Sequence, residues 1–222
     1  MATGTSQSVT IPAGGVHLSG DLVAPGSPRG VVVFAHGSGS SRHSPRNRAV
    51  ASALNDRGLA TLLVDLLTED EEQVDLRTRH LRFDVRLLAE RLAAAAEWTA
   101  DHPSLPGVAI GYFGASTGAA AALIAAALKP EGIGAIVSRG GRPDLAGDFL
   151  PQVSAPTLLL VGGRDDVVLD LNRQAQTRLE CPAELQVIPG ATHLFEEPGA
   201  LEAVSSAAGD WFLRHLPSPG RG

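Results

Sequence analysis

The sequence predicts an α/β protein in which a mostly parallel sheet of eight strands carries helices on both faces. Short apolar runs of strand length alternate along the chain with longer segments of helical spacing. Several of these runs, such as residues 31–35, are apolar at every position, which is typical of strands buried on both faces of a parallel sheet. Only the first two runs are joined by a tight turn. An antiparallel pair is therefore expected to open a doubly wound, otherwise parallel sheet.

The expected strands differ from the expected helices in length and composition. The first two flank the turn Pro12-Ala13-Gly14-Gly15, and the second alternates apolar and polar residues. Most of the others are short and rich in valine, isoleucine or leucine. The expected strands are residues 8–11, 16–23, 31–35, 59–65, 108–113, 132–137, 157–161 and 185–188.

Helices are expected where apolar residues recur every three or four positions. These segments are residues 45–57, 76–100, 119–128, 169–179 and 201–216, with an acidic connection at 66–75. Residues 138–156 leave room for a loop and one short helix, so no cap domain is expected there. No repeat or linker interrupts the chain, so we expect one domain over residues 1–222, with 1–7 and 217–222 flexible.

Composition and charge disfavour several classes of function. The chain has 222 residues, a formal net charge of -6 and a pI of about 5.6, which disfavours nucleic-acid binding. No stretch has the character of a signal peptide or a membrane span, so a cytoplasmic location without a membrane partner is expected. Cys181 is the only cysteine, which excludes an internal disulfide.

One motif has the form that a serine nucleophile needs. Residues 114–118 read Gly-Ala-Ser-Thr-Gly, a G-x-S-x-G pattern between an expected strand and an expected helix. The small residues around Ser116 allow the two elements to meet at a sharp turn. Because many glycine- and serine-rich turns match so loose a pattern, the motif alone leaves its function open.

A serine hydroxyl needs a general base, and the base needs a third group to orient it. These groups are expected after the carboxyl ends of later strands, in the order serine, acid, histidine. Asp165 follows the seventh expected strand, and His193 follows the eighth. Asp166 is a rival for the acid, and either aspartate could instead cap the next helix. We predict Ser116 as nucleophile, Asp165 as the orienting acid and His193 as the base.

The oxyanion formed on attack needs two backbone N–H donors. The N–H of Thr117, at the start of the helix after the nucleophile, is one expected donor. The loop His36-Gly37-Ser38-Gly39 is expected to supply the other from Ser38, with His36 structuring the loop. Alternatively, this loop is a flexible turn. It lacks the spacing and the lysine of a phosphate-binding loop, so nucleotide binding is not expected.

Together these features resemble the α/β-hydrolases, most closely the cap-less branch related to dienelactone hydrolases. The resemblance covers nearly the whole chain and rests on residues 36–39, 114–118, 162–165 and 190–195. It implies the α/β-hydrolase fold without a cap domain, and Ser116, Asp165 and His193 as the catalytic triad. Dienelactone hydrolases proper carry cysteine where this chain has Ser116. This departure moves the expected activity toward a serine esterase or acyl hydrolase that forms an acyl-enzyme.

Five arginines follow two of the expected strands near the predicted site, namely Arg42, Arg46, Arg48, Arg139 and Arg142. Guanidinium groups bind carboxylate or phosphate in a bidentate manner. We therefore predict an anionic ester substrate, with Arg46, Arg139, Arg142 and His43 lining its pocket. The alternative is that these arginines pair with acids of the chain such as Asp144 and Asp148, or face water.

The sequence predicts neither a cofactor nor a metal ion, because no histidines and acids cluster at ligand spacing. Cys181 precedes an expected strand, so we expect a small buried residue there and not a nucleophile. The expected partner is a small-molecule ester, bound by a monomer or homodimer, although thioester, amide or carbon–carbon cleavage would use the same residues. The alternative from another class is a catalytically silent binding or regulatory module, which would have no need of the three triad residues together.

Overall fold

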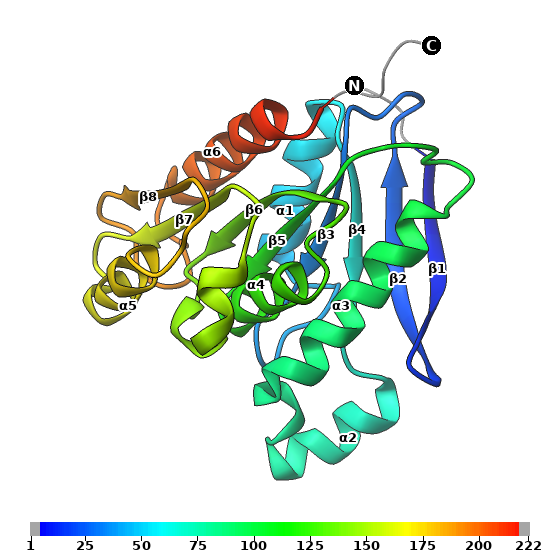
Figure 1. The fold of residues 1–222 in the computed structure, drawn as a ribbon, viewed down its shortest axis with the longest axis horizontal. Coiled ribbons are helices and arrows are strands. Elements are labelled where there is room, and N and C mark those ends of the chain that lie inside the picture. The colour runs from blue at the N-terminus through cyan, green and yellow to red at the C-terminus, as the bar shows by residue number, and fades with distance from the viewer. Residues whose placement is uncertain (1–4, 218–222) are drawn as a thin grey trace.

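The computed structural model describes residues 5–217, and their strands form one eight-stranded sheet in the order β1-β2-β4-β3-β5-β6-β7-β8 (Figure 1). β2 runs antiparallel to both of its neighbours, and the remaining pairs are parallel. The predicted fold class is therefore confirmed. The strands are β1 (Thr5–Ala13), β2 (Val16–Ala24), β3 (Val31–Ala35), β4 (Ala60–Val64), β5 (Ile110–Ala115), β6 (Ile133–Arg139), β7 (Thr157–Gly162) and β8 (Ala183–Ile188).

Helices cover both faces of this sheet. The helical segments are α1 (Pro45–Asp56), α2 (Glu69–Thr78), the 3-10 turn η1 (Leu81–Phe83), α3 (Val85–Ala100), α4 (Thr117–Leu128), the 3-10 segment η2 (Pro143–Gln152), α5 (Asp166–Gln176) and α6 (Ala200–His215). α1 and α6 pack together on one face, whereas α3, α4 and α5 lie on the other. None of the helices within residues 5–217 has both the length and the apolar character needed to cross a bilayer.

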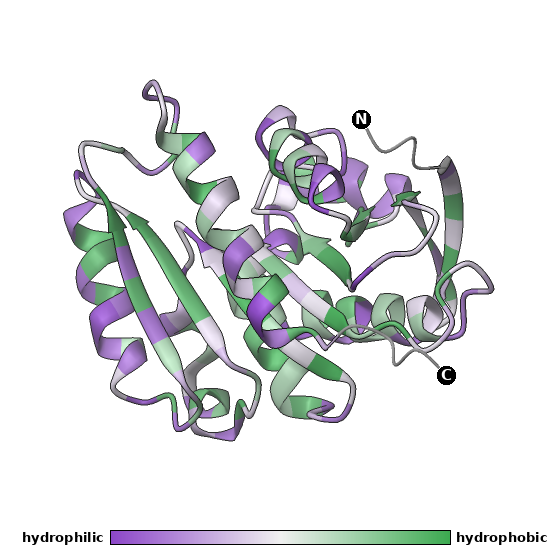
Figure 2. Cartoon of the chain, turned by 90° about the horizontal axis from the view of Figure 1, so that it is seen from above, coloured by the Kyte–Doolittle hydropathy of each residue, from purple (hydrophilic) through white to green (hydrophobic). Residues whose placement is uncertain are grey.

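Two apolar cores flank the sheet, because successive residues of a strand point to opposite faces. In β3, Val31 and Val33 belong to the core under α3 and α4, whereas Val32 and Phe34 belong to the core under α1 and α6. The helices carry hydrophobic and hydrophilic bands along their length (Figure 2), as expected when one side packs on the sheet and the other faces water.

The predicted long helix over residues 76–100 is wrong, as is the acidic connection before it. The acidic stretch forms α2, which begins at a capping box in which Thr68 and Glu71 satisfy each other's backbone N–H groups. α2 ends at Arg79, whose left-handed backbone (φ 57°) stops the helix. η1 follows, and Asp84 caps α3 by accepting the N–H of Leu87. As a result, α2 projects from the body of the molecule beside the carboxyl ends of β3 and β4 (Figure 1).

The segment between β6 and β7 contains only η2, a 10-residue segment with a kink at Gly147. It holds no cap domain. At the N-terminal end, where a flexible segment was predicted, residues 5–7 belong to β1 and pair with residues 22–24 of β2. Of the other residues predicted to be flexible, Pro217 is exposed and lies outside any helix or strand, and residues 1–4 and 218–222 lie outside the described residues.

Candidate active site

Ser116 occupies a sharp turn between β5 and α4. Its backbone has φ 52° and ψ -122°, a combination that residues with a side chain rarely adopt. Backbone hydrogen bonds hold the turn: the Ser116 N–H donates to the Arg139 carbonyl (3.2 Å), and its carbonyl accepts from Ala119 and Arg142 (both 3.1 Å). This geometry lifts the Ser116 side chain above the carboxyl edge of the sheet.

Two glycines allow the strand and the helix to meet this closely. A Cβ on Gly118 would lie 2.2 Å from the Ala35 carbonyl oxygen, and one on Gly114 would lie 2.4 Å from the Ala119 Cα. Both distances are far inside van der Waals contact, so neither position accepts a side chain without a backbone shift. The small residues of the G-x-S-x-G motif are therefore required by the turn itself.

The predicted acid and base are in direct contact. His193 Nδ1 lies 2.7 Å from Asp165 Oδ2, and the two side chains are 39% and 16% exposed. Asp165 stands at the N-cap of α5, yet its side chain makes no capping hydrogen bond and turns to His193 instead. The rival Asp166 is the first residue of the helix and is exposed. With Nδ1 held by the carboxylate, Nε2 is the ring nitrogen left to exchange a proton with a nucleophile.

The loop that carries His193 is tied to the end of β7. The N–H groups of Gly163 and Arg164 donate to the carbonyls of Ile188 and Ala191, both at 2.9 Å. A Cβ on Gly162 would lie 2.5 Å from the Ala191 carbonyl oxygen, so a side chain there would push the loop away. The segments that carry the acid and the base are thus fixed to each other by backbone contacts.

Phe195 and Glu197, which follow His193 in the chain, anchor the same loop. Phe195 is fully buried in the core under α1 and α6 and has a left-handed backbone (φ 55°). The carboxylate of Glu197 accepts the Thr192 N–H at 3.1 Å, and this hydrogen bonding holds the pKa of Glu197 below its usual value. Phe195 and Glu197 together therefore hold the loop that carries the His193 imidazole.

Ser116 and His193 flank the same short segment at the end of β6. Ser116 binds the Arg139 carbonyl, while His193 packs over the next residue, where a Cβ on Gly140 would lie 3.5 Å from His193 Nδ1. No hydrogen bond within residues 5–217 involves the Ser116 hydroxyl, so its pairing with His193 stays a prediction. Such contacts are often formed only when substrate is bound.

The two predicted oxyanion donors are neighbours in space. The Ser38 N–H donates to the Thr117 hydroxyl oxygen at 2.9 Å, across 79 positions of sequence. In this structure the Thr117 side chain therefore occupies the predicted Ser38 donor, and the role of Ser38 in binding an oxyanion stays a prediction. An oxyanion could use it only after displacing the hydroxyl, or by sharing the N–H with it.

His36 structures the loop before Ser38, as the sequence suggested. Its Nε2 accepts the Leu66 N–H (3.1 Å), so its Nδ1 carries the proton and donates to the Gly37 carbonyl (3.0 Å). Burial lowers the pKa of His36, which keeps the ring neutral at pH 7. The ring therefore binds the exit of β3 to the exit of β4 and is engaged at both nitrogens.

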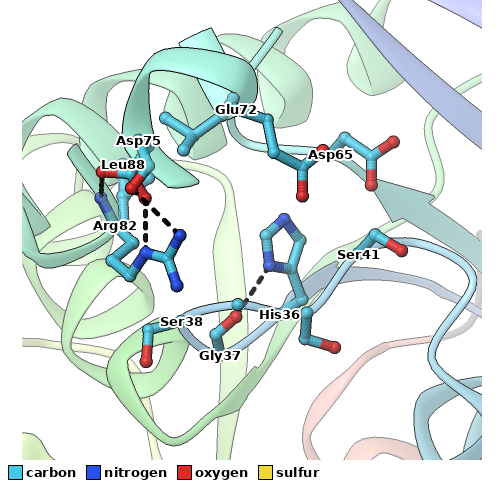
Figure 3. Close-up of a pocket in the computed structure, with 12 residues that line it drawn as sticks. His36, Gly37, Ser38, Ser41, Asp65, Glu72, Asp75, Arg82 and Leu88 are labelled. Carbon is cyan, nitrogen blue, oxygen red and sulfur yellow. Dashed lines mark hydrogen bonds and ion pairs between the residues drawn. The ribbon is translucent and has the colours of Figure 1, made fainter. Parts of the chain in front are cut away.

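A crevice opens beside the elbow, between the loop after β3 and α2 (Figure 3). At one end is Gly37, where a Cβ would lie 3.0 Å from the Ser116 Cβ. Leu67 and Leu88 supply apolar wall, and Glu72 reaches from α2 toward the His36 ring. Arg82 also lines the crevice and forms an ion pair with buried Asp75. The Asp75 carboxylate accepts two further hydrogen bonds, from the backbone N–H groups of Leu81 and Arg82.

Sequence reasoning missed the α2 wall of this crevice, because it assigned residues 66–75 to an acidic connection, although it did predict Ser38, which lines the crevice, as a site residue. One signal was present: Thr68 and Glu71 have the T-x-x-E spacing of a capping box, which marks the start of a helix. The roles of Phe195 and Glu197 behind His193 were also missed, and no local pattern announces them.

Most of the predicted substrate-binding side chains are engaged with other groups of the chain. Arg142 forms two hydrogen bonds with Asp144 (both 2.8 Å), the alternative that the sequence left open. His43 is exposed and contacts Arg48, which pairs with Asp21. Arg42 pairs with Asp65 and Asp21, and Arg46 pairs with Glu196 at 2.9 Å. Arg139 differs, because it is buried and has no acidic partner within residues 5–217.

The single cysteine lies at the opposite edge of the sheet from Ser116, just before β8. Cys181 is partly buried, and burial raises the pKa of its thiol. Its sulfur lies 3.8 Å from the Thr157 hydroxyl. Its position at the other end of the strands therefore separates Cys181 from the predicted nucleophile Ser116.

Comparisons with known proteins agree with this architecture. The sequence model of the dienelactone hydrolase family matches residues 18–216. A crystal structure of dienelactone hydrolase from Anabaena variabilis is 56% identical, with a TM-score of 0.94 over 96% of this chain and 99% of that one. Est1E from Butyrivibrio proteoclasticus shares the fold, with a TM-score of 0.76 at 18% identity over 93% of this chain and 98% of that one.

A relative among curated proteins is longer than this chain. A Mycobacterium tuberculosis protein named "Putative phosphoribosyl transferase" is 58% identical over 214 residues, which are 96% of this chain and 47% of that protein. The chain thus spans about half the length of the curated relative that it matches.

Proposed function

The chain belongs to the dienelactone hydrolase family, and we propose that it is a serine hydrolase that cleaves carboxylic esters through an acyl-enzyme. The observation that carries this proposal is the contact between Asp165 and His193, in which a helix N-cap aspartate leaves its helix uncapped to hold an imidazole. That arrangement orients a base beside a strained serine, as nucleophilic catalysis requires.

In the first half of the reaction, Ser116 Oγ attacks the ester carbonyl carbon, and its proton passes to His193 Nε2. The Asp165 carboxylate stabilises the imidazolium. The carbonyl oxygen becomes an oxyanion that accepts hydrogen bonds from the Thr117 N–H at the start of α4 and, after the Thr117 hydroxyl has released it, from the Ser38 N–H. The C–O bond to the alcohol then breaks, His193 protonates the leaving oxygen, and the acyl group remains on Ser116.

In the second half, water takes the place of the alcohol. His193 removes a proton from the water, whose oxygen attacks the acyl carbon and forms a second oxyanion. When this intermediate collapses, the bond to Ser116 Oγ breaks and the proton returns to Ser116 through His193. The products are a carboxylic acid and the free enzyme.

A fluorophosphonate probe tests the proposal directly, because it labels serines activated by a neighbouring base. We expect stoichiometric labelling of the wild type and none of Ser116→Ala or His193→Ala. p-Nitrophenyl esters of graded chain length should give a burst of p-nitrophenol when deacylation is the slower half. A folded wild type that neither reacts with the probe nor hydrolyses any of these esters would instead favour a catalytically silent binding module.

Cys181 provides a control for the identity of the nucleophile, since dienelactone hydrolases proper carry a cysteine at the elbow. The Cys181→Ser variant is expected to keep full activity, and iodoacetamide is expected to leave the wild type active. Loss of activity in either experiment would point away from Ser116.

The printed name of the mycobacterial relative suggests phosphoribosyl transfer, which we do not extend to this chain. The chain matches 47% of that protein. In this chain, the turn at residues 114–118 has the G-x-S-x-G motif of enzymes that transfer acyl groups. We therefore propose hydrolase chemistry for this chain.

A further inference from the structure

Arg139 is a buried arginine without a counter-ion within residues 5–217. The residue is 8% exposed, and its one side-chain hydrogen bond runs from Nη2 to the neutral Asn47 Oδ1 at 3.2 Å. Its Nε and Nη1 are buried without a hydrogen-bond partner in the described chain, and the guanidinium lies over the Phe195 ring, 5.8 Å from the ring centroid. Buried guanidinium groups are normally paired, because leaving their N–H donors unsatisfied costs free energy.

A second arginine, Arg46, lies on the same side of the elbow. Arg139 binds Asn47, the residue after Arg46, and stacks on Phe195, the residue before Glu196, which is the partner of Arg46. Arg46 Nε is also buried without a partner in the part of the chain that is described, while Arg46 Nη1 binds Glu196. Burial, and then the positive charge of Arg46, lowers the pKa of Arg139 to about 10, so Arg139 is still a cation at pH 7. Together the two guanidinium groups have three buried nitrogen atoms without a hydrogen-bond partner within residues 5–217, namely Nε and Nη1 of Arg139 and Nε of Arg46. Such N–H donors match the oxygen acceptors of a carboxylate or phosphate.

Both arginines adjoin the proposed catalytic residues. The Arg139 carbonyl accepts the Ser116 N–H, and the next residue, Gly140, packs beneath His193. Arg46 is in the first turn of α1, where the structure places no acidic residue, and it reaches Glu196 on the His193 loop. The paired donors therefore lie on the α1 side of the elbow, next to the base.

We propose that Arg139 and Arg46 bind an oxyanion of the substrate, a carboxylate or phosphate remote from the ester bond that is cleaved. This proposal rests on ester hydrolysis at Ser116. Glu196 is 63% exposed, so its carboxylate can leave Arg46 for solvent without losing a buried contact. The incoming anion then replaces Glu196 on Arg46 and accepts hydrogen bonds from Nε and Nη1 of Arg139.

The test compares two p-nitrophenyl esters of equal chain length, the glutarate monoester and the valerate. We expect the wild type to favour the glutarate monoester in kcat/KM. In Arg139→Gln this preference should fall about 10- to 100-fold, the usual effect of removing hydrogen bonds to a charged group. Arg46→Gln should reduce it less, and Glu196→Gln should increase it. Arg173→Gln is the matched control, because it removes an exposed arginine from α5.

Folding is checked by circular dichroism, and the valerate rate reports whether the catalytic residues remain in place. An unchanged preference in folded Arg139→Gln would overturn the proposal, as would a wild type without any preference. Should Arg139→Gln fail to fold, Arg46→Gln and Glu196→Gln decide through their opposite expected effects, and equal preferences in these two variants would overturn it.

Binding to Ser116→Ala separates this proposal from the proposed function. Calorimetric titration with glutarate and with inorganic phosphate needs no turnover. Binding that is lost when Arg139→Gln is added supports the anion site even if neither ester is hydrolysed, and the tighter of the two anions identifies the group. Absence of binding of both anions, beside normal valerate hydrolysis by the wild type, would overturn the anion site and leave the esterase proposal intact.

Discussion

Individual residues carry the strain and the close contacts that build this site. Ser116 has a backbone conformation suited to glycine, and Phe195 holds a left-handed conformation while buried. Such conformations cost free energy and persist only where the surrounding structure enforces them. Both residues here position groups of the proposed triad: Ser116 is the proposed nucleophile, and Phe195 anchors the loop that carries His193, the proposed base.

The strain at Ser116 should be measurable as stability. The free energy of unfolding of Ser116→Gly is expected to be about 1 kcal/mol larger than that of Ser116→Ala. Glycine relieves the backbone strain of the turn, and this gain exceeds the conformational entropy that glycine adds to the unfolded chain. Urea unfolding of the two inactive variants measures the difference. If Ser116→Gly is the less stable of the two, the turn is not strained.

The hydrogen bond from Ser38 to Thr117 makes a second residue-level prediction. Thr117→Val keeps the shape of the side chain but removes the acceptor, so the loop after β3 loses a contact that fixes it beside Ser116. We expect kcat for a neutral ester to fall about two- to tenfold, as for one neutral hydrogen bond. Thr117→Ser, which retains the oxygen, should stay near the wild type. A faster Thr117→Val would mean that the hydroxyl competes with the oxyanion instead.

At the level of elements, the buried strands and the elbow were predictable because their signals are local. Apolar runs mark β3, β5 and β7, and a G-x-S-x-G motif between strand and helix marks the turn. α2 was missed because it is acidic and buries little of its surface. Its stability comes from caps and ion pairs that apolar periodicity does not detect.

The sequence also allowed only part of the arginine ion pairing to be predicted. Asp144 lies two positions from Arg142, and that pairing was open to sequence reasoning. Arg139 has no acidic partner within residues 5–217 because α1 brings it the neutral Asn47 and the His193 loop brings it the Phe195 ring, so only the folded structure reveals this environment.

The anchoring of α2 to α3 gives an element-level prediction with a pH dependence. Glu71 caps α2 and binds buried Arg91, whose hydrogen bonds hold the pKa of Glu71 at about 2. Glu71→Gln should reduce the free energy of unfolding by about 1–2 kcal/mol at pH 7, a value reduced for solvent screening because the side chain is a quarter exposed.

The sign of the pH effect follows from the lowered pKa. The stabilisation is complete above the unfolded pKa near 4.5 and is lost as pH falls toward 2. Urea unfolding at pH 7 and pH 3 should therefore show a smaller difference between Glu71→Gln and the wild type at pH 3. Glu90→Gln is the control, since its exposed pair with Arg86 should contribute little. A difference that is the same at both pH values would refute the role of the Glu71 charge.

On the scale of the whole molecule, one sheet supports two cores. Neighbouring residues of β3 belong to opposite cores, so neither core can dissolve without disrupting the strands that complete the other. This arrangement leads us to expect one cooperative unit, in keeping with the single domain that the sequence predicts.

The two tryptophans report on the two cores separately. Trp98 on α3 packs against one, and Trp211 on α6 is buried in the other. Trp98→Phe and Trp211→Phe each leave a single reporter, and fluorescence and circular dichroism should give the same urea midpoint within each variant. Different midpoints from the two probes in one variant would show that the layers unfold independently.

The tie between the end of β7 and the His193 loop has a consequence for the order in which the chain is made. Translation delivers the elbow long before it delivers β8 and the loop after it. A nascent chain that has reached only β7 lacks His193, the base that the proposed mechanism requires for attack by Ser116. On the proposed mechanism, Ser116 gains its base only when synthesis has passed β8 and reached His193, so esterase reactivity is expected only from chains that extend beyond that residue.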